Sequence, residues 1–249
     1  MPFISCLAVF LSGPAQTYGV SVFVDPMLAE LGWSRSLFST LYSLGTLASA
    51  GALVFVGRQI DRVGNRVVLT IAVIGFGASM LLLSTASGVF IVFLSFAMLR
   101  TFGSGVLTLA ARNLVPNWFH SRAGRAFSLI GLAAMLSQAV VPLFNNLMID
   151  MVGWCNARQV NAIIMWVLLL PIVAIAIRNR PADIGQFPDD TPPARDDITV
   201  SADDAKGVTL HAALRTTTFW FLIGASVVPS LVVTGLASGE PERPMKTGS

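Results

Sequence analysis

The sequence predicts an all-α membrane protein. Only 12% of its 249 residues are charged and 54% are hydrophobic, whereas a soluble domain carries about 25% charged residues. Seven stretches of 18 to 24 residues each contain one charged residue or none. About 20 predominantly apolar residues are enough for a helix to cross a bilayer. Low charge and long apolar stretches therefore exclude a single water-soluble core.

The expected spans are residues 3–24, 37–56, 67–84, 89–111, 126–149, 160–177 and 219–237. We expect the first to be interrupted at Gly13-Pro14, because proline cannot donate a backbone hydrogen bond. In the second, Gly45, Ser49 and Ala52 recur at helical spacing, which favours close helix packing. The third and sixth contain few polar residues, so we expect them to face lipid.

The chain is expected to divide into four parts. Residues 1–178 would form a six-helix N-terminal transmembrane bundle, 179–218 a cytoplasmic linker, 219–237 a seventh transmembrane helix and 238–249 a polar tail. The linker contains seven aspartates and four prolines, a composition that cannot bury enough apolar surface to order itself. Six helices, a linker and one further helix suggest a larger protein cut short.

The distribution of Lys and Arg predicts the orientation. Basic residues gather in the segments around Arg62 and Arg122 and after residue 177, whereas Arg35 and Arg158 are the basic residues of the other side. Basic segments favour the cytoplasm. We therefore expect a cytoplasmic N-terminus, Trp33 and Trp154 on the outside, and residence in the plasma membrane.

Several classes of function are excluded. The net charge of +3 is small and scattered, so no nucleic-acid partner is expected. Cys6 and Cys155 have no disulfide or metal-ligand spacing, and neither His120 nor His211 stands beside a plausible catalytic nucleophile or carboxylate. No phosphate-binding Gly-x-x-x-x-Gly-Lys motif occurs. We expect neither an enzyme nor a bound cofactor or metal.

Arg100 is the sharpest single signal, because it lies midway along the fourth span. A central arginine costs about 2.5–3.5 kcal/mol on insertion scales, and no Asp or Glu falls within any expected span to neutralise it. One interpretation is that its planar guanidinium binds the carboxylate of an anionic substrate. The other is that it donates to carbonyls and side chains of the first and fifth spans and holds the bundle together. Both interpretations remain open at this stage.

Four other polar residues are candidate lining of a polar interior. Gln16 and Tyr18 lie in the first span, and Gln138 and Asn145 lie in the fifth. Gln138, Pro142 and Asn145 share one helix face by spacing. Because polar groups are costly in hydrocarbon, the first, fourth and fifth spans should enclose this interior. For the fifth span, cavity lining and helix–helix hydrogen bonding both remain open.

The segment between the second and third spans carries a family resemblance. Its pattern Gly57-x-x-x-Asp61-Arg62-x-Gly64-x-Arg66 resembles the signature loop of the major facilitator superfamily; Asn65 departs from the usual basic residue. Further segments resemble the oxalate/formate antiporter and monocarboxylate transporter branch. These segments are residues 30–36, 118–126, 180–185 and 213–220.

The resemblance implies the six-helix N-terminal bundle of the major facilitator fold plus one further transmembrane helix. It implies secondary transport of a small organic anion, monocarboxylate-like, by alternating access, with a proton as a candidate coupling ion. Residues 57–66 would act as a conformational gate, and the partners would be the lipid bilayer and a C-terminal half absent from this chain. We therefore expect the chain alone not to catalyse coupled transport. The alternative is a non-transporting seven-helix membrane protein, whether scaffold, receptor-like or degenerate fragment.

Overall fold

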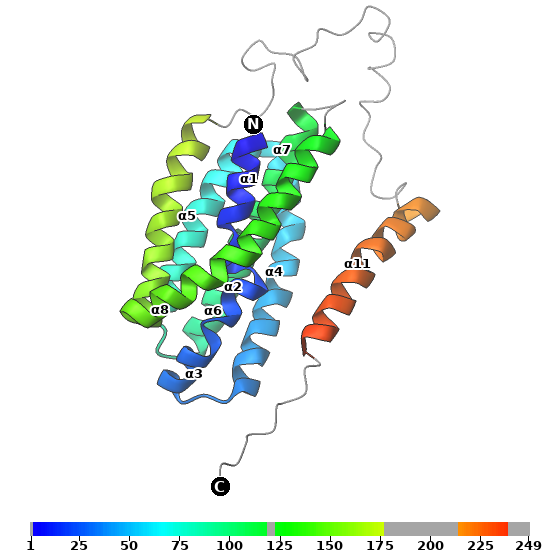
Figure 1. Cartoon of the computed structure of the whole chain (residues 1–249). Helices are drawn as coiled ribbons and strands as arrows, with labels where there is room; N and C mark the ends of the chain where they lie inside the picture. The colour runs from blue at the N-terminus through cyan, green and yellow to red at the C-terminus, as the bar shows by residue number, and fades with distance from the viewer. Residues whose placement is uncertain (1, 119–122, 177–213, 239–249) are drawn as a thin grey trace, which may run out of the picture. The chain divides into compact units, whose positions relative to one another are not determined.

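The computed structural model describes residues 2–118, 123–176 and 214–238, and every regular element within them is helical (Figure 1). This confirms the predicted all-α class. The chain divides into two compact units, residues 1–192 and 193–249. In the second unit α11 (Thr217–Ser238) covers the expected seventh span. The expected linker is outside the described residues up to 213, and the expected tail is outside them from 239.

The first unit contains a bundle of helices, listed here in chain order. They are α1 (Pro2–Leu11), η1 (Gly13–Ala15), α2 (Thr17–Ser21), α3 (Val24–Leu31), α4 (Arg35–Val63), α5 (Asn65–Ser84), α6 (Val89–Met98), η2 (Leu99–Leu107), α7 (Thr108–Trp118) and α8 (Ala123–Ala176). Here η1 is a 3-10 turn and η2 is a π-helix.

Five helical stretches within the described residues are long and apolar enough to cross a membrane. They are Phe3–Ser21, Arg35–Ile60, Asn65–Ser84, Val89–Pro116 and Ala123–Ile175. The last has 53 residues and is divided at Gly153, whose φ of 80° is not helical. Its two parts correspond to the expected fifth and sixth spans. The expected seventh span, α11, is not among these five stretches.

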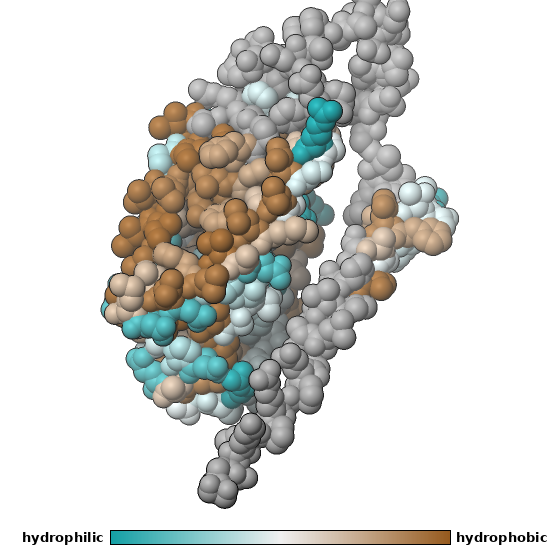
Figure 2. All heavy atoms as spheres, viewed as in Figure 1, coloured by the Kyte–Doolittle hydropathy of each residue, from teal (hydrophilic) through white to brown (hydrophobic). Residues whose placement is uncertain are grey.

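The bundle core is centred on one face of α5. Leu69, Ala72, Val73, Phe76 and Met80 are fully buried there, and α5 packs against α6, η2 and α8. The opposite face exposes apolar residues such as Val67, Ile71 and Ile74. The third span therefore has a lipid-type face but is also a core helix. Figure 2 shows a broad hydrophobic area over this unit, with hydrophilic residues gathered toward one end.

The segment predicted as a gate loop is helical, which corrects the expectation of a loop over residues 57–66. Helix α4 continues through Gly57 to Val63, and α5 begins at Asn65. Gly64 alone breaks the helix, with φ 90° and ψ 159°. Its N–H donates to the Ile60 carbonyl, and its carbonyl accepts from Val68. A helix can extend past the apolar core because its own backbone groups stay paired, and glycine tolerates the positive φ.

The sixth span begins earlier than expected. The second part of α8 is helical from Trp154, so Arg158 lies inside a helix and not in an outer loop. Trp154, Ala157, Arg158, Asn161 and Met165 are all buried. Their helical spacing marks one core-facing stripe that includes a charged residue.

Candidate functional site around the broken first helix

The first span breaks where its sequence removes a backbone donor. Pro14 has no N–H, so the Phe10 carbonyl loses the partner that it would have in a continuous α-helix. The structure supplies a replacement, because the Ser137 hydroxyl donates to Phe10 O at 2.7 Å. Tyr18 in turn donates its hydroxyl to Ser137 Oγ at 3.0 Å. A three-member polar chain thus links α8 to both sides of the break.

The Pro14 and Ala15 carbonyls of η1 are bound by side chains, whereas the Gly13 carbonyl accepts from Gln16 N. Gly19 N and Val20 N both donate to the Gln16 carbonyl, so Gly19 does not donate to Ala15 as it would in a continuous helix. Ala15 O instead accepts from Arg100 Nη1 at 3.4 Å. The adjacent Pro14 O accepts from Arg158 Nη1, also at 3.4 Å. Two arginines from different helices therefore meet consecutive carbonyls of one turn.

A fourth side chain completes this layer. Asn145 Nδ2 donates to the Gly19 carbonyl at 3.5 Å, and its Oδ1 accepts from Asn161 at 2.9 Å. The pair joins the two parts of α8 across the Gly153 break. Four carbonyls of the first span, at residues 10, 14, 15 and 19, are therefore bound by side chains of η2 and α8. We call this set of contacts the helix-break site.

Arg100 is placed by the π-helix η2. Thr101 and Ser104 each donate a hydroxyl to the carbonyl four residues earlier. Gly103 allows the helix to approach the break closely, since a Cβ there would lie 2.4 Å from Ala15 Cβ. Short π-helical segments often occur at functional sites. The half-buried Arg100 also lies over the Tyr42 ring, 5.3 Å from Cζ to the ring centroid.

Arg158 is a residue that the sequence interpretation missed. It is fully buried, at 0% exposure, and its Cζ lies 3.6 Å from the centroid of the Phe23 ring. Because of its charge, the expected sixth span began too late, at residue 160, and Arg158 was placed outside the membrane. The apolar periodicity that continues back to Trp154 would have found it.

The charges at the helix-break site are not balanced by a carboxylate within the described part of the chain. Asp25 pairs with Arg35 on the surface, and the Glu30 carboxylate accepts from the Trp154 indole. Neither Arg100 nor Arg158 forms an ion pair with any residue that the structure describes. Such a site carries positive charge and can bind an anion.

The other predicted residues are distributed as follows. Gln16 is half-buried and donates to Ser12 Oγ at 3.4 Å. Gln138 is exposed on α8, so it does not share the buried environment of Asn145, although spacing puts both on one face. Within the described residues no group of three or more His, Cys, Asp or Glu could hold a metal ion.

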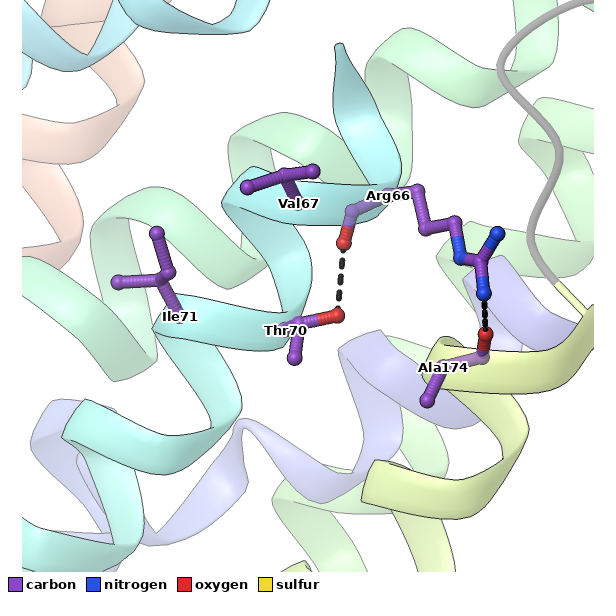
Figure 3. A pocket seen from close by; sticks show the side chains of 5 residues that line it. All are labelled: Arg66, Val67, Thr70, Ile71 and Ala174. Atoms are coloured by element: carbon purple, nitrogen blue, oxygen red, sulfur yellow. Dashed lines mark hydrogen bonds between the residues drawn. The ribbon is translucent and has the colours of Figure 1, made fainter. Parts of the chain in front are cut away.

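The gate residues lie at the far end of α4 and the start of α5. Arg62 and Arg66 are exposed, and the side chain of Asp61 is outside the described part of the structure. Arg66 donates to the Ala174 carbonyl of α8, over a shallow hollow lined by Val67, Thr70 and Ile71 (Figure 3). This contact ties α5 to the end of α8 and lies apart from the helix-break site.

Comparison with known proteins decides the family. The family model described as Major Facilitator Superfamily matches residues 5–239. The chain belongs to the major facilitator superfamily. It is thus an integral membrane protein of a transporter family, and not an enzyme.

Curated relatives of this superfamily member are similar at low identity. "MFS-type transporter 1" of Ophiocordyceps sp. (strain BCC 1869) is 26% identical over 72% of this chain and 37% of its own length. "Puromycin resistance protein pur8" of Streptomyces alboniger is 28% identical over 61% of this chain and 30% of its own length. "Probable anion transporter 4, chloroplastic" of Oryza sativa subsp. japonica is 26% identical over 60% of this chain and 26% of its own length. The chain therefore spans little more than a third of these relatives at most.

Proposed function

We propose that residues 2–176 act as the N-terminal half of a secondary transporter that moves a small, monocarboxylate-like organic anion by alternating access. The observation that carries the proposal is the pair of arginines at the helix-break site, with no ion-pairing carboxylate among the described residues. An arginine inside a membrane span is energetically unfavourable. A carboxylate substrate would offset that cost and match the planar guanidinium.

In this proposal Arg100 is the substrate contact. Its Nη1 binds Ala15 O, and its Nε is buried without a partner. The Arg100 side chain as a whole is only half-buried. Gln16, Tyr18, Gln138 and Asn145 are proposed as further lining or coupling residues. The name of the rice relative, an anion transporter, agrees with this class of substrate.

The broken first helix supports the mechanism. In transporters, interrupted spans bring free backbone groups and half-helix ends to a site near the midplane, and two bundles then rock around it. Here η1 and η2 place such a break and a π-helix side by side. Gly57, Asp61, Arg62, Gly64 and Arg66 would form the gate on the cytoplasmic side. A proton is the coupling ion that we propose to test.

Binding is the direct test, because it does not require turnover. Purified chain in detergent is titrated with sodium formate, acetate or lactate, against sodium chloride at equal ionic strength. We expect a saturable rise in the thermal unfolding midpoint with at least one carboxylate. Arg100→Gln should abolish the rise and Arg100→Lys should reduce it, because an ammonium lacks the two-pronged donor.

Arg35→Gln is the matched control, since Arg35 is an exposed arginine paired with Asp25. It should keep the full effect of the carboxylate. Equal midpoints in carboxylate and chloride, or a full response in Arg100→Gln, would contradict the proposal. Proton coupling is then examined in lipid vesicles that contain this chain together with a C-terminal half. A pH gradient across the vesicle membrane should change the rate of carboxylate uptake.

A further inference from the structure

The guanidinium of Arg158 has one edge without a partner. Nη1 donates to Pro14 O, and the planar face lies on the Phe23 ring. Nε and Nη2 are buried and donate to no atom among the described residues. These two nitrogens lie on the same edge of the group, so their hydrogens point in parallel.

An unpaired edge at a fully buried charge is costly. Removing a cation from water is unfavourable unless an opposite charge and hydrogen bonds replace the solvent. The Phe23 ring face replaces only part of the lost hydration, since it contacts the plane of the guanidinium and not its Nε–Nη2 edge. An acceptor that brings two oxygens and negative charge would satisfy this edge.

A carboxylate meets both requirements. Its two oxygens match two parallel N–H groups, and such forked pairs are among the strongest charge-assisted hydrogen bonds. Arg158 and Arg100 are bound to consecutive carbonyls, at Pro14 and Ala15, and each has a buried Nε without a partner. The two guanidinium groups thus flank one turn of the chain.

We propose that the Nε–Nη2 edge of Arg158 is a second carboxylate-binding position beside Arg100. This inference rests on the proposed function, in which Arg100 holds the first carboxylate. The second carboxylate comes either from the far end of one dicarboxylate or from a separate monocarboxylate. The chemistry at Arg158 is the same in both cases.

The test compares four-carbon acids that differ in the number of carboxylates. Purified full chain in detergent is titrated with succinate or with butyrate at equal ionic strength, and the midpoint shift gives an apparent affinity. If one dicarboxylate spans the positions, succinate should bind at least tenfold more tightly than butyrate. Arg158→Gln should then lower the ratio of the succinate affinity to the butyrate affinity to about one. If two monocarboxylates bind, butyrate should titrate two sites in the wild type and one in Arg158→Gln.

Arg158→Lys guards against misfolding of the neutral variant, because it keeps the charge and removes the edge; it should behave as Arg158→Gln does. The wild-type succinate and butyrate titrations require no variant at all. Arg35→Gln serves as the surface arginine control. One-site titrations with equal affinities for both acids and unaltered titrations in the Arg158 variants would overturn the inference while leaving the proposed function intact. Absence of any carboxylate effect in the wild type would overturn both.

Discussion

At the residue scale, the first span is repaired by side chains from other helices. A proline within a membrane helix frees a carbonyl that has no water to bind. Ser137 takes over the Phe10 carbonyl, and Arg100, Arg158 and Asn145 take over three more. The break is therefore stable only inside this bundle.

Removal of the Ser137 hydroxyl should destabilise the chain. Ser137→Ala leaves the Phe10 carbonyl and the Tyr18 hydroxyl without their partner, and a buried unpaired group costs about 1–3 kcal/mol. We expect a lower thermal midpoint in detergent. Ser128→Ala is the control, because this exposed serine of α8 bonds only within its own helix. Equal midpoints for the two variants would show that the hydroxyl of Ser137 is dispensable.

At the element scale, glycines determine where helices break and how closely they approach. Gly64 and Gly153 adopt positive φ at two breaks. Gly45 lets α4 pack onto α6, since a Cβ there would lie 3.0 Å from Phe96 Cβ and from Ala97 N. Gly45 and Ser49 are thus buried within the bundle, and Ala52 of the same face is half-buried.

Gly64→Ala tests the break between α4 and α5. A residue with a Cβ at φ 90° and ψ 159° is strained, by about 1–3 kcal/mol, so the unfolding midpoint should fall. Gly51→Ala is the comparison in the same helix; Gly51 is helical and a Cβ there meets nothing within 4 Å. That change should be neutral or stabilising by up to about 1 kcal/mol. A midpoint for Gly64→Ala at or above that of Gly51→Ala would refute the assigned strain.

Gly103→Ala tests the contact between η2 and the break. Its Cβ would lie 2.4 Å from Ala15 Cβ and 2.6 Å from Phe76 Cε2. Overpacking of this kind costs about 1–3 kcal/mol, and it should also move Arg100 away from Ala15. We expect a lower midpoint and weaker carboxylate binding. Gly131→Ala, at an open position of α8, should preserve both, and a Gly103 variant that also preserves both would exclude a tight contact.

At the scale of the whole molecule, segments predicted on one side of the membrane lie together in the bundle. Trp154, predicted outside, donates a hydrogen bond to Glu30, which lies three residues before Trp33 of the same predicted side. Arg66, predicted inside, contacts the carbonyl of Ala174 near the end of α8. Which end faces the cytoplasm follows from the charge asymmetry alone and remains a prediction.

Single cysteines should report that orientation. In a background without Cys6 and Cys155, Arg62→Cys should resist a membrane-impermeant thiol reagent in intact cells, and Asp150→Cys should react. Both positions are exposed in the bundle, so burial does not explain a difference. Permeabilised cells, in which both should react, are the control. Reaction of Arg62→Cys in intact cells would reverse the orientation.

The sequence by itself determined the all-α class, the approximate positions of the helices in the bundle and the break in the first span. Long apolar stretches admit only helices or closed barrels in a bilayer, and the Gly13-Pro14 pair removes a donor in any environment. The resemblance to the superfamily followed from a motif of five residues between the second and third spans, namely Gly57, Asp61, Arg62, Gly64 and Arg66. These signals are local, so no knowledge of neighbouring helices was needed.

Only the tertiary structure decided which polar residues act together. Hydropathy counted Arg158 as an outer charge, because a guanidinium is costly in hydrocarbon unless a partner is present. Its partners, Pro14 O and the Phe23 ring, are more than 130 residues away in the chain. The free carbonyls of the first span and the side chains that bind them meet only after folding. Their charge and geometry, and hence the helix-break site, are properties of the packed bundle.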